Sequence, residues 1–110
     1  KIGLMDEKYF VYYDDTDFVW RASQEEMSVL YYPMVIIRHR VSFSTGGAKS
    51  PFSIYYTNRN RVYFIRKNFT FFYKLISLSY FLLTRIANIF IYSKEEKASM
   101  IKGYLAGWKL

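Results

Sequence analysis

The sequence is poor in three kinds of residue, and each shortage narrows what the chain can be. It has no cysteine and only two prolines, and just nine of its 110 residues are acidic. The lack of cysteine excludes a disulfide framework and a cysteine-ligated zinc site. A length of 110 residues corresponds to one domain or to a piece of one.

Long uncharged runs are also scarce in the most apolar region, residues 69–92. The longest uncharged run there is the ten residues from Leu75 to Thr84, between Lys74 and Arg85. A transmembrane helix needs roughly 20 predominantly apolar residues. A charge near the bilayer centre costs about 2.5–3.5 kcal/mol on insertion scales. This region is therefore expected to be a helix buried against protein or one lying in a membrane interface.

Apolar side chains are abundant, and the few acidic residues are concentrated at one end. The chain is 52% hydrophobic and 22% aromatic, which is enough for a core and too apolar for disorder. Residues 1–30 hold three basic and seven acidic residues, whereas residues 31–110 hold thirteen basic and two acidic ones. The basic part could face nucleotide phosphates, nucleic acid or anionic lipid, or it could be a solvated surface.

Two regions in the first half of the chain show local structure signals. Asp14 is predicted to cap a helix that runs to about Met27, with Asp17 at the N3 position. Asp17 and Arg21 are then an i,i+4 ion pair. Residues 29–41 are rich in β-branched and aromatic side chains, so two short strands separated at Pro33 are predicted.

Three helices are predicted in the second half. Ser50 followed by Pro51 marks the start of a helix over residues 51–68. Asn68 is predicted to cap the apolar helix of residues 69–92, whose polar residues recur at helical spacing as a narrow stripe. Ser93 and Glu96 form a capping box for a last helix. Its buried face is predicted to contain Ala98, Ile101, Tyr104, Leu105 and Trp108.

Three carboxylates in the stretch YYDDTDFVWR are candidate functional groups. A helix start explains Asp14 and Asp17, because the helix dipole stabilises negative charge at its N-terminus. Asp15 has no such structural task. A carboxylate at a helix N-terminus stays ionised, and an ionised carboxylate beside a hydroxyl group can act as a general base.

The single histidine and the basic stretch after residue 58 are weaker candidates. His39 lies between Arg38 and Arg40, either as a partly exposed side chain or as a contact for a metal or a diphosphate. Arg59 and Arg61 could bind acidic headgroups or simply lie on a solvated helix face. Nothing in the sequence matches a known nucleic-acid-binding module, so no nucleic-acid partner is expected.

The stretch GLMDEKYFVYYDDTDFVWRA resembles the later part of the catalytic domain of family 2 glycosyltransferases, especially the bacterial rhamnosyltransferase-like enzymes. These enzymes show a phrase such as F-D-E-x-F-F-x-Y-x-E-D-x-D-L-x-x-R. It occurs here as Met5-Asp6-Glu7, Tyr9-Phe10, Tyr12-Tyr13, Asp14-Asp15, Asp17-Phe18 and Trp20-Arg21. His39, the small-residue loop 42–50, the pair Arg59-Asn60 and the tail IKGYLAGW match the family in order. Asp14 stands where glutamate is usual.

The resemblance implies a fold and a reaction. The fold is the C-terminal portion of an α/β GT-A domain, with about two short strands and mostly helices. Residues 1–50 would end the catalytic domain, and residues 51–110 would form a helical region that faces a membrane or a partner. The reaction is an inverting transfer of a sugar from a nucleotide-sugar to a glycan or lipid-linked acceptor.

The resemblance also assigns roles to residues. Asp15 would be the general base and Asp14 would support it, while Asp17 and Arg21 would fix the helix. His39 would contact the metal or the diphosphate. A divalent metal, Mg²⁺ or Mn²⁺, would be bound mainly by residues outside this chain, so the chain alone would be inactive.

A different reading of the same composition is a non-catalytic basic and aromatic helical module that docks on a membrane or a protein partner. Under either reading we expect a cytoplasmic protein, with peripheral contact to the inner face of the plasma membrane as an open alternative. A homodimer is a further expectation.

Overall fold

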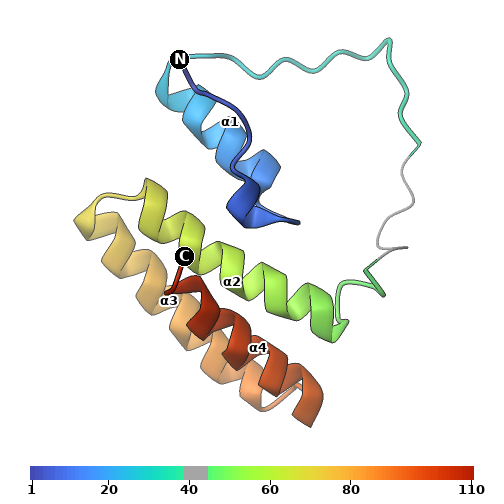
Figure 1. The fold of residues 1–110 in the computed structure, drawn as a ribbon, viewed down its shortest axis with the longest axis vertical. Coiled ribbons are helices and arrows are strands. Elements are labelled where there is room, and N and C mark those ends of the chain that lie inside the picture. The colour runs from blue at the N-terminus through green and yellow to red at the C-terminus, as the bar shows by residue number, and fades with distance from the viewer. Residues whose placement is uncertain (39–44) are drawn as a thin grey trace.

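The computed structural model describes residues 1–38 and 45–110, and its regular elements are helices. A short 3₁₀ helix, η1 (Glu7–Tyr9), precedes α1 (Asp14–Gln24). The second half of the chain forms α2 (Pro51–Asn68), α3 (Phe71–Ile89) and α4 (Lys94–Gly107). Helices α2, α3 and α4 pack side by side, and α1 lies against the outer side of α2 (Figure 1). The molecule is only 22 Å deep along its shortest axis, so every helix keeps an exposed side.

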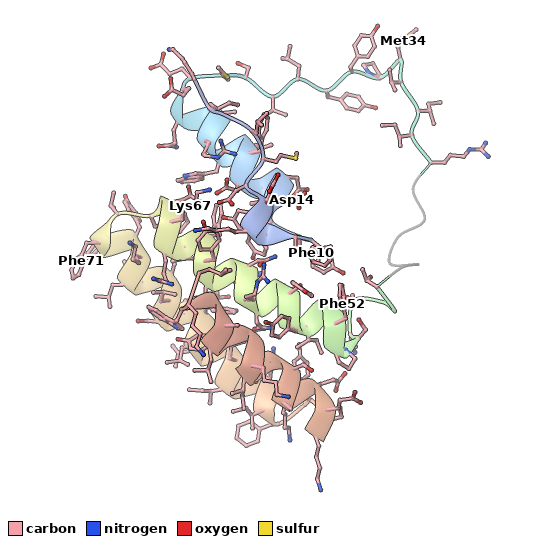
Figure 2. The ribbon with its side chains drawn as sticks, viewed as in Figure 1. Phe10, Asp14, Met34, Phe52, Lys67 and Phe71 are labelled. Carbon is pink, nitrogen blue, oxygen red and sulfur yellow. The ribbon has the colours of Figure 1, made fainter. Side chains whose placement is uncertain are left out.

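The predicted α/β fold is wrong: none of residues 1–38 and 45–110 lies in a β-strand. Of the predicted strand region 29–41, residues 29–38 run as an extended chain away from the helices, as Met34 shows in Figure 2. Residues 39–41 lie outside the described part. The β propensity of such side chains depends on a neighbouring strand. The described chain offers none, and Leu30, Tyr31 and Ile36 are almost fully exposed. A GT-A fragment with strands is therefore not what this chain forms.

Two predicted helix starts are confirmed. The Ser50 hydroxyl accepts a hydrogen bond from the Ser53 backbone N–H at 3.1 Å, and Pro51 is the first residue of α2. The Ser93 hydroxyl accepts from the backbone N–H of Glu96 at 3.3 Å, and the Glu96 carboxylate accepts from the Ser93 N–H at 2.7 Å. These caps form within four residues of chain, so a local pattern was enough to predict them.

Two other predicted caps are wrong. Asp14 is the first residue of α1, and the N-cap position is held by Tyr13, in the left-handed conformation at φ 70° and without a side-chain cap. Asn68 ends α2, while Thr70 occupies the N-cap position of α3. The Asn68 amide instead donates to Asp17, 51 residues away. A tertiary contact has replaced the local one.

Helix α4 packs on α2 through small residues rather than through its apolar side chains. The predicted inward face is wrong, because Ile101, Leu105 and Trp108 are exposed. Met100, Gly103 and Gly107 are the buried residues. A Cβ atom at Gly103 would collide with the backbone carbonyl of Tyr55, and one at Gly107 would collide with that of Arg59. The two glycines allow the backbones of α2 and α4 to approach closely.

Candidate functional site

Asp17 lies at the centre of a buried polar cluster between α1 and α2. Its Oδ1 atom accepts hydrogen bonds from the Tyr9 hydroxyl at 2.9 Å and from the Asn68 amide at 2.8 Å. Its Oδ2 atom accepts from Arg21 Nε at 2.8 Å and from Lys67 Nζ at 2.9 Å. Burial alone would raise the pKa of the Asp17 carboxyl, but these four donors outweigh burial and lower it. Asp17 is thus a structural anion, and its predicted i,i+4 pair with Arg21 is present.

Lys67 connects this cluster to a second carboxylate, Asp6. Its ammonium group lies 2.8 Å from Asp6 Oδ2, and the Tyr63 hydroxyl donates to the same oxygen at 2.9 Å. Burial would raise the pKa of Asp6, but the hydrogen bonds from Lys67, the Lys8 backbone and Tyr63 lower it. Burial, followed by the contact with Asp6, raises the pKa of Tyr63 to about 12. Lys67 of α2 therefore forms ion pairs with two carboxylates from the first 17 residues. Figure 2 shows Lys67 between α1 and α2.

The turn that leads into α1 is strained and is held from α2. Phe10, Tyr12 and Tyr13 have positive φ values of 62°, 63° and 70°. Such a conformation costs roughly 1–3 kcal/mol per non-glycine residue and persists only where the surroundings enforce it. Here the enforcing group is Asn60, which is fully buried. Its amide donates to the carbonyl oxygens of Tyr9, Val11 and Tyr12 at 2.9, 2.6 and 2.9 Å.

Arg59 and Arg61 add to this hold on the turn. Arg59 donates to the carbonyl oxygen of Tyr9 at 3.1 Å and to Asn60 Oδ1 at 2.9 Å, which fixes the orientation of the Asn60 amide. Arg61 donates to the Tyr13 hydroxyl at 2.5 Å. The pair Arg59-Asn60 is thus a clamp on the segment immediately before Asp14 and Asp15.

Asp15 emerges from this clamped turn into solvent. It is exposed, and its Oδ1 atom accepts from the Thr16 backbone N–H at 2.6 Å and from the Thr16 hydroxyl at 3.2 Å. Its other oxygen has no hydrogen-bond donor within the described residues. Asp15 lines a surface groove of about 420 Å³, whose further lining residues are Thr16, Val19, Trp20, Ser23 and Phe64.

Asp14 faces a different hollow from Asp15. It is half-buried and lines a shallow depression with Met5, Asp6, Glu7 and Phe10. The structure therefore separates the three carboxylates of α1: Asp17 is buried, Asp14 lies beside η1, and Asp15 alone opens onto the groove.

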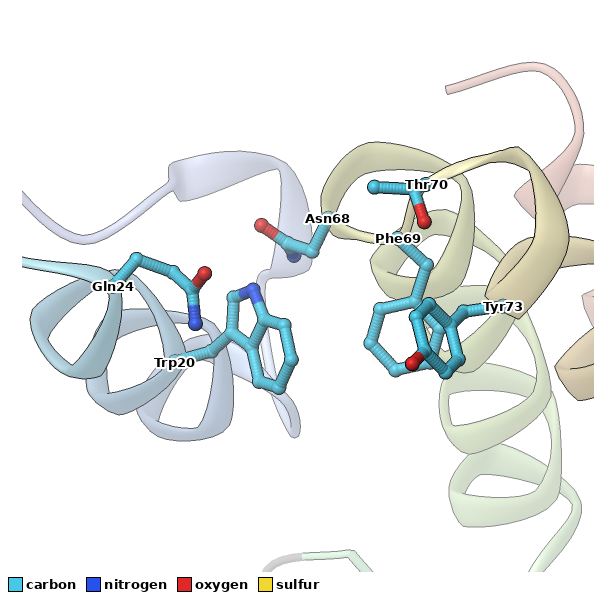
Figure 3. A pocket seen from close by; sticks show the side chains of 6 residues that line it. All are labelled: Trp20, Gln24, Asn68, Phe69, Thr70 and Tyr73. Carbon is cyan, nitrogen blue, oxygen red and sulfur yellow. The ribbon is translucent and has the colours of Figure 1, made fainter.

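A second cavity lies on the other side of Trp20. It has a volume of about 280 Å³, and Figure 3 shows its lining residues, Trp20, Gln24, Asn68, Phe69, Thr70 and Tyr73. The Trp20 ring packs 5.2 Å from the Phe69 ring. Aromatic walls with a few amide groups are a common lining for an organic ligand. Trp20 borders both this cavity and the groove that Asp15 lines.

The predicted contact of His39 and the predicted divalent metal stay predictions. His39 lies outside the described residues. Within residues 1–38 and 45–110, no three His, Cys, Asp or Glu side chains converge as metal ligands. The carboxylates of the described site thus do not fit a Mg²⁺ or Mn²⁺ centre of their own.

Sequence reasoning missed the roles of Asn60, Lys67 and Asn68. All three lie in the second half of α2, on the side that faces η1 and α1. Asn60 and Lys67 are two helical turns apart, and this spacing of polar residues among buried aromatic ones was the available signal. Comparisons of the chain with protein-family models, curated proteins and solved structures find no match.

Proposed function

We propose that this chain carries the acceptor side of an inverting glycosyltransferase, with Asp15 as the general base. In this reaction a hydroxyl oxygen of the acceptor attacks the anomeric carbon of a nucleotide-sugar. The bond from that carbon to the diphosphate breaks, and the nucleoside diphosphate leaves. Asp15 takes the hydroxyl proton as the new glycosidic bond forms.

The observation that carries the proposal is the difference between Asp15 and its two neighbours. Asp15 is the one carboxylate of the three that is exposed at a groove with an oxygen free of described donors. A general base has to reach the proton it removes and has to be held in place. The groove gives an acceptor access to Asp15, and the turn that Asn60 holds fixes the position of Asp15.

The groove also suits a glycan acceptor. Trp20 borders the groove on one side and the aromatic cavity on the other. The flat ring offers an apolar surface for the C–H groups of a pyranose, while Gln24 and Asn68 offer amide groups for its hydroxyls. Asp14, half-buried and next to Asp15 in the chain, would support the base. We assign no residue of this chain to the donor nucleotide.

The test is sugar transfer by the full-length protein, measured as release of nucleoside diphosphate from UDP-, GDP- and dTDP-activated sugars with a glycan acceptor. Asp15→Asn is expected to lower the turnover about 10²- to 10⁴-fold, because general-base catalysis contributes a factor of that size. The unfolding midpoint should stay unchanged, since Asp15 is exposed.

Glu25→Gln is the matched control, because Glu25 is a partly exposed carboxylate at the other end of α1. It should retain full turnover. Normal turnover in Asp15→Asn would contradict the base assignment, and no turnover with any donor would contradict the enzymatic proposal itself.

A further inference from the structure

Helix α3 has its polar side turned inward and its apolar side turned outward. Phe81, which is 2% exposed, is its one buried residue. The half-buried positions around Phe81 are mostly polar: Lys74, Ser77, Leu78, Thr84, Arg85 and Asn88. A surface helix of a globular protein normally shows the opposite arrangement. The narrow polar stripe seen in the sequence is therefore the inner face of this helix.

Specific contacts fix this rotation of α3. Arg85 donates to the side-chain oxygen of Asn58 on α2 at 3.1 Å. The guanidinium groups of Arg85 and Arg61 lie 4.8 and 5.2 Å from the centre of the Phe81 ring, on which both can stack. The Phe81 ring also packs 6.0 Å from Tyr104 of α4. Turning α3 to bury its apolar side would break all of these contacts.

The outer face of α3 is a continuous apolar surface. Phe72 is 66% exposed, Tyr80 69% and Leu83 65%. Between them lie further apolar side chains that are each about half exposed, Leu75, Ile76, Leu82 and Ile86. A helix of 19 residues is about 28 Å long. An apolar surface of this length on a soluble protein marks a site of interaction with another surface.

The charge around this surface is mostly positive, although the first turn of α4 contains Glu95 and Glu96. Residues 71–89 include Lys74 and Arg85 and no acidic residue. On the neighbouring helix Lys94 and Lys102 are exposed, as is Lys109 just after it, and the chain as a whole carries a net charge of +7. An occupant that is apolar where it meets α3 and negatively charged around it matches both properties.

We propose that the outer face of α3 binds an anionic lipid bilayer, with the helix lying in the plane of the interface. An amphipathic helix with a basic surround binds the boundary between headgroups and acyl chains in this way. Phe71, Phe72, Tyr73 and Tyr80 would lie at headgroup level, where aromatic side chains are favoured. Among the helices of the described residues, none is long and apolar enough to cross a bilayer.

Charge also argues against a second copy of the chain as the occupant. Pairing two α3 faces would bring together two chains that each carry a net charge of +7. Like charges disfavour such an association. An anionic membrane attracts the same charges.

The test is flotation of the full chain with vesicles of phosphatidylcholine, with and without about 30% phosphatidylglycerol. Binding is expected to the anionic vesicles, to weaken as salt is added, and to fall about tenfold or more in a Leu75→Gln, Leu83→Gln double variant. Leu4→Gln is the matched control, because Leu4 is 90% exposed and lies far from α3 in sequence. That variant should bind as the unaltered chain does.

The absence of cysteine permits a direct readout of depth. A single Leu83→Cys variant labelled with an environment-sensitive fluorophore should shift to the blue on binding, whereas a labelled Leu4→Cys variant should not. Equal binding to neutral vesicles, or an unshifted label at position 83, would overturn the proposal. So would vesicle-independent dimerisation that the double variant abolishes. None of these readouts depends on Asp15, so this proposal and the proposed function can fail separately.

Discussion

Helices α1 and α4 are both attached to α2, but they are attached by different chemistry. Between α1 and α2, four donors surround the buried carboxylate of Asp17, and two of them are cations. Between α4 and α2, Gly103 and Gly107 place one backbone directly against the other. The first contact is directional and centred on a buried charge, while the second is close-packed, with one cation, Arg66, donating to the carbonyl oxygens of Gly107 and Trp108 at its edge.

The difference explains where the candidate site lies. A close-packed contact fixes the distance between two helices, but it leaves no polar group available for chemistry. A network of charged hydrogen bonds fixes the direction of each side chain as well. The turn before Asp15 is attached by directional hydrogen bonds of this kind, from Asn60 and Arg59. Placing a reactive carboxylate requires this directional kind of attachment.

The largest effect is expected from removing the charge at the centre of the α1–α2 contact. Asp17→Asn leaves Lys67 and Arg21 partly buried beside a neutral amide, since their side chains are only 27% and 21% exposed. Losing one partner of a buried ion pair costs about 3–5 kcal/mol. The measurement is the free energy of unfolding in urea. Asp14→Asn on the same turn is the control and should change it little; an equally small effect for Asp17→Asn would contradict the central role of this residue.

A smaller effect is expected at the α2–α4 contact. Gly103→Ala places a methyl group against the Tyr55 carbonyl, so the two helices have to separate slightly. Overpacking of this kind costs about 1–3 kcal/mol. Lys102→Ala, one residue away and exposed, serves as the control and should be neutral or slightly stabilising in the same urea titration. If Gly103→Ala were as stable as its control, the close approach of the two backbones would not be a determinant of stability.

The smallest effect, and the one that separates the two contacts, is expected from acid. The pKa of Asp17 in the folded chain lies below its ordinary value of 3.8, and so does that of Asp6. The unfolded chain therefore binds more protons between the two values, and folding is stabilised above them. This stabilisation is full at neutral pH and is lost as the pH falls through the folded pKa. At about pH 3 only part of it is lost.

The measurement is the unfolding free energy of the unaltered chain and of two variants between neutral pH and about pH 3. Asp17→Asn should lose less stability on acidification than the unaltered chain does. Gly103→Ala should lose as much as the unaltered chain, because the close approach of Gly103 to the Tyr55 backbone involves no carboxylate. Equal acid sensitivity of all three proteins would show that the two contacts do not differ in this respect.

The sequence predicted those features of the fold that depend on neighbouring residues. Ser50 with Pro51 and Ser93 with Glu96 bond within their own first turn, so their patterns were sufficient. Asn68 has the same capping chemistry, yet its amide is used by Asp17 on another helix. No local pattern could reveal that partner. The prediction of the buried face of α4 was wrong for a related reason. The close approach of the two backbones requires glycine rather than larger apolar residues.

The candidate site could be predicted in part. Sequence reasoning separated Asp15 from Asp17, and in the structure Asp15 is exposed while Asp17 is buried. It explained Asp14 by a helix cap that does not form. It also gave no role to Asn60, because the positive φ values that Asn60 supports at Phe10, Tyr12 and Tyr13 have no signature in those residue types. Strain in a turn becomes visible only with the backbone.

The extended segment 29–38 has a consequence for how the protein behaves in concentrated solution. Its side chains are apolar and largely exposed, and its backbone has no strand beside it in the described chain. Exposed apolar segments without a neighbouring strand commonly start aggregation. Pro33 interrupts the segment at a point where an N–H donor would otherwise be available, and Arg38 follows its last isoleucine. A proline and a flanking charge are the residues that oppose self-pairing most effectively. Pro33 and Arg38 therefore limit the association of copies of the chain along this segment.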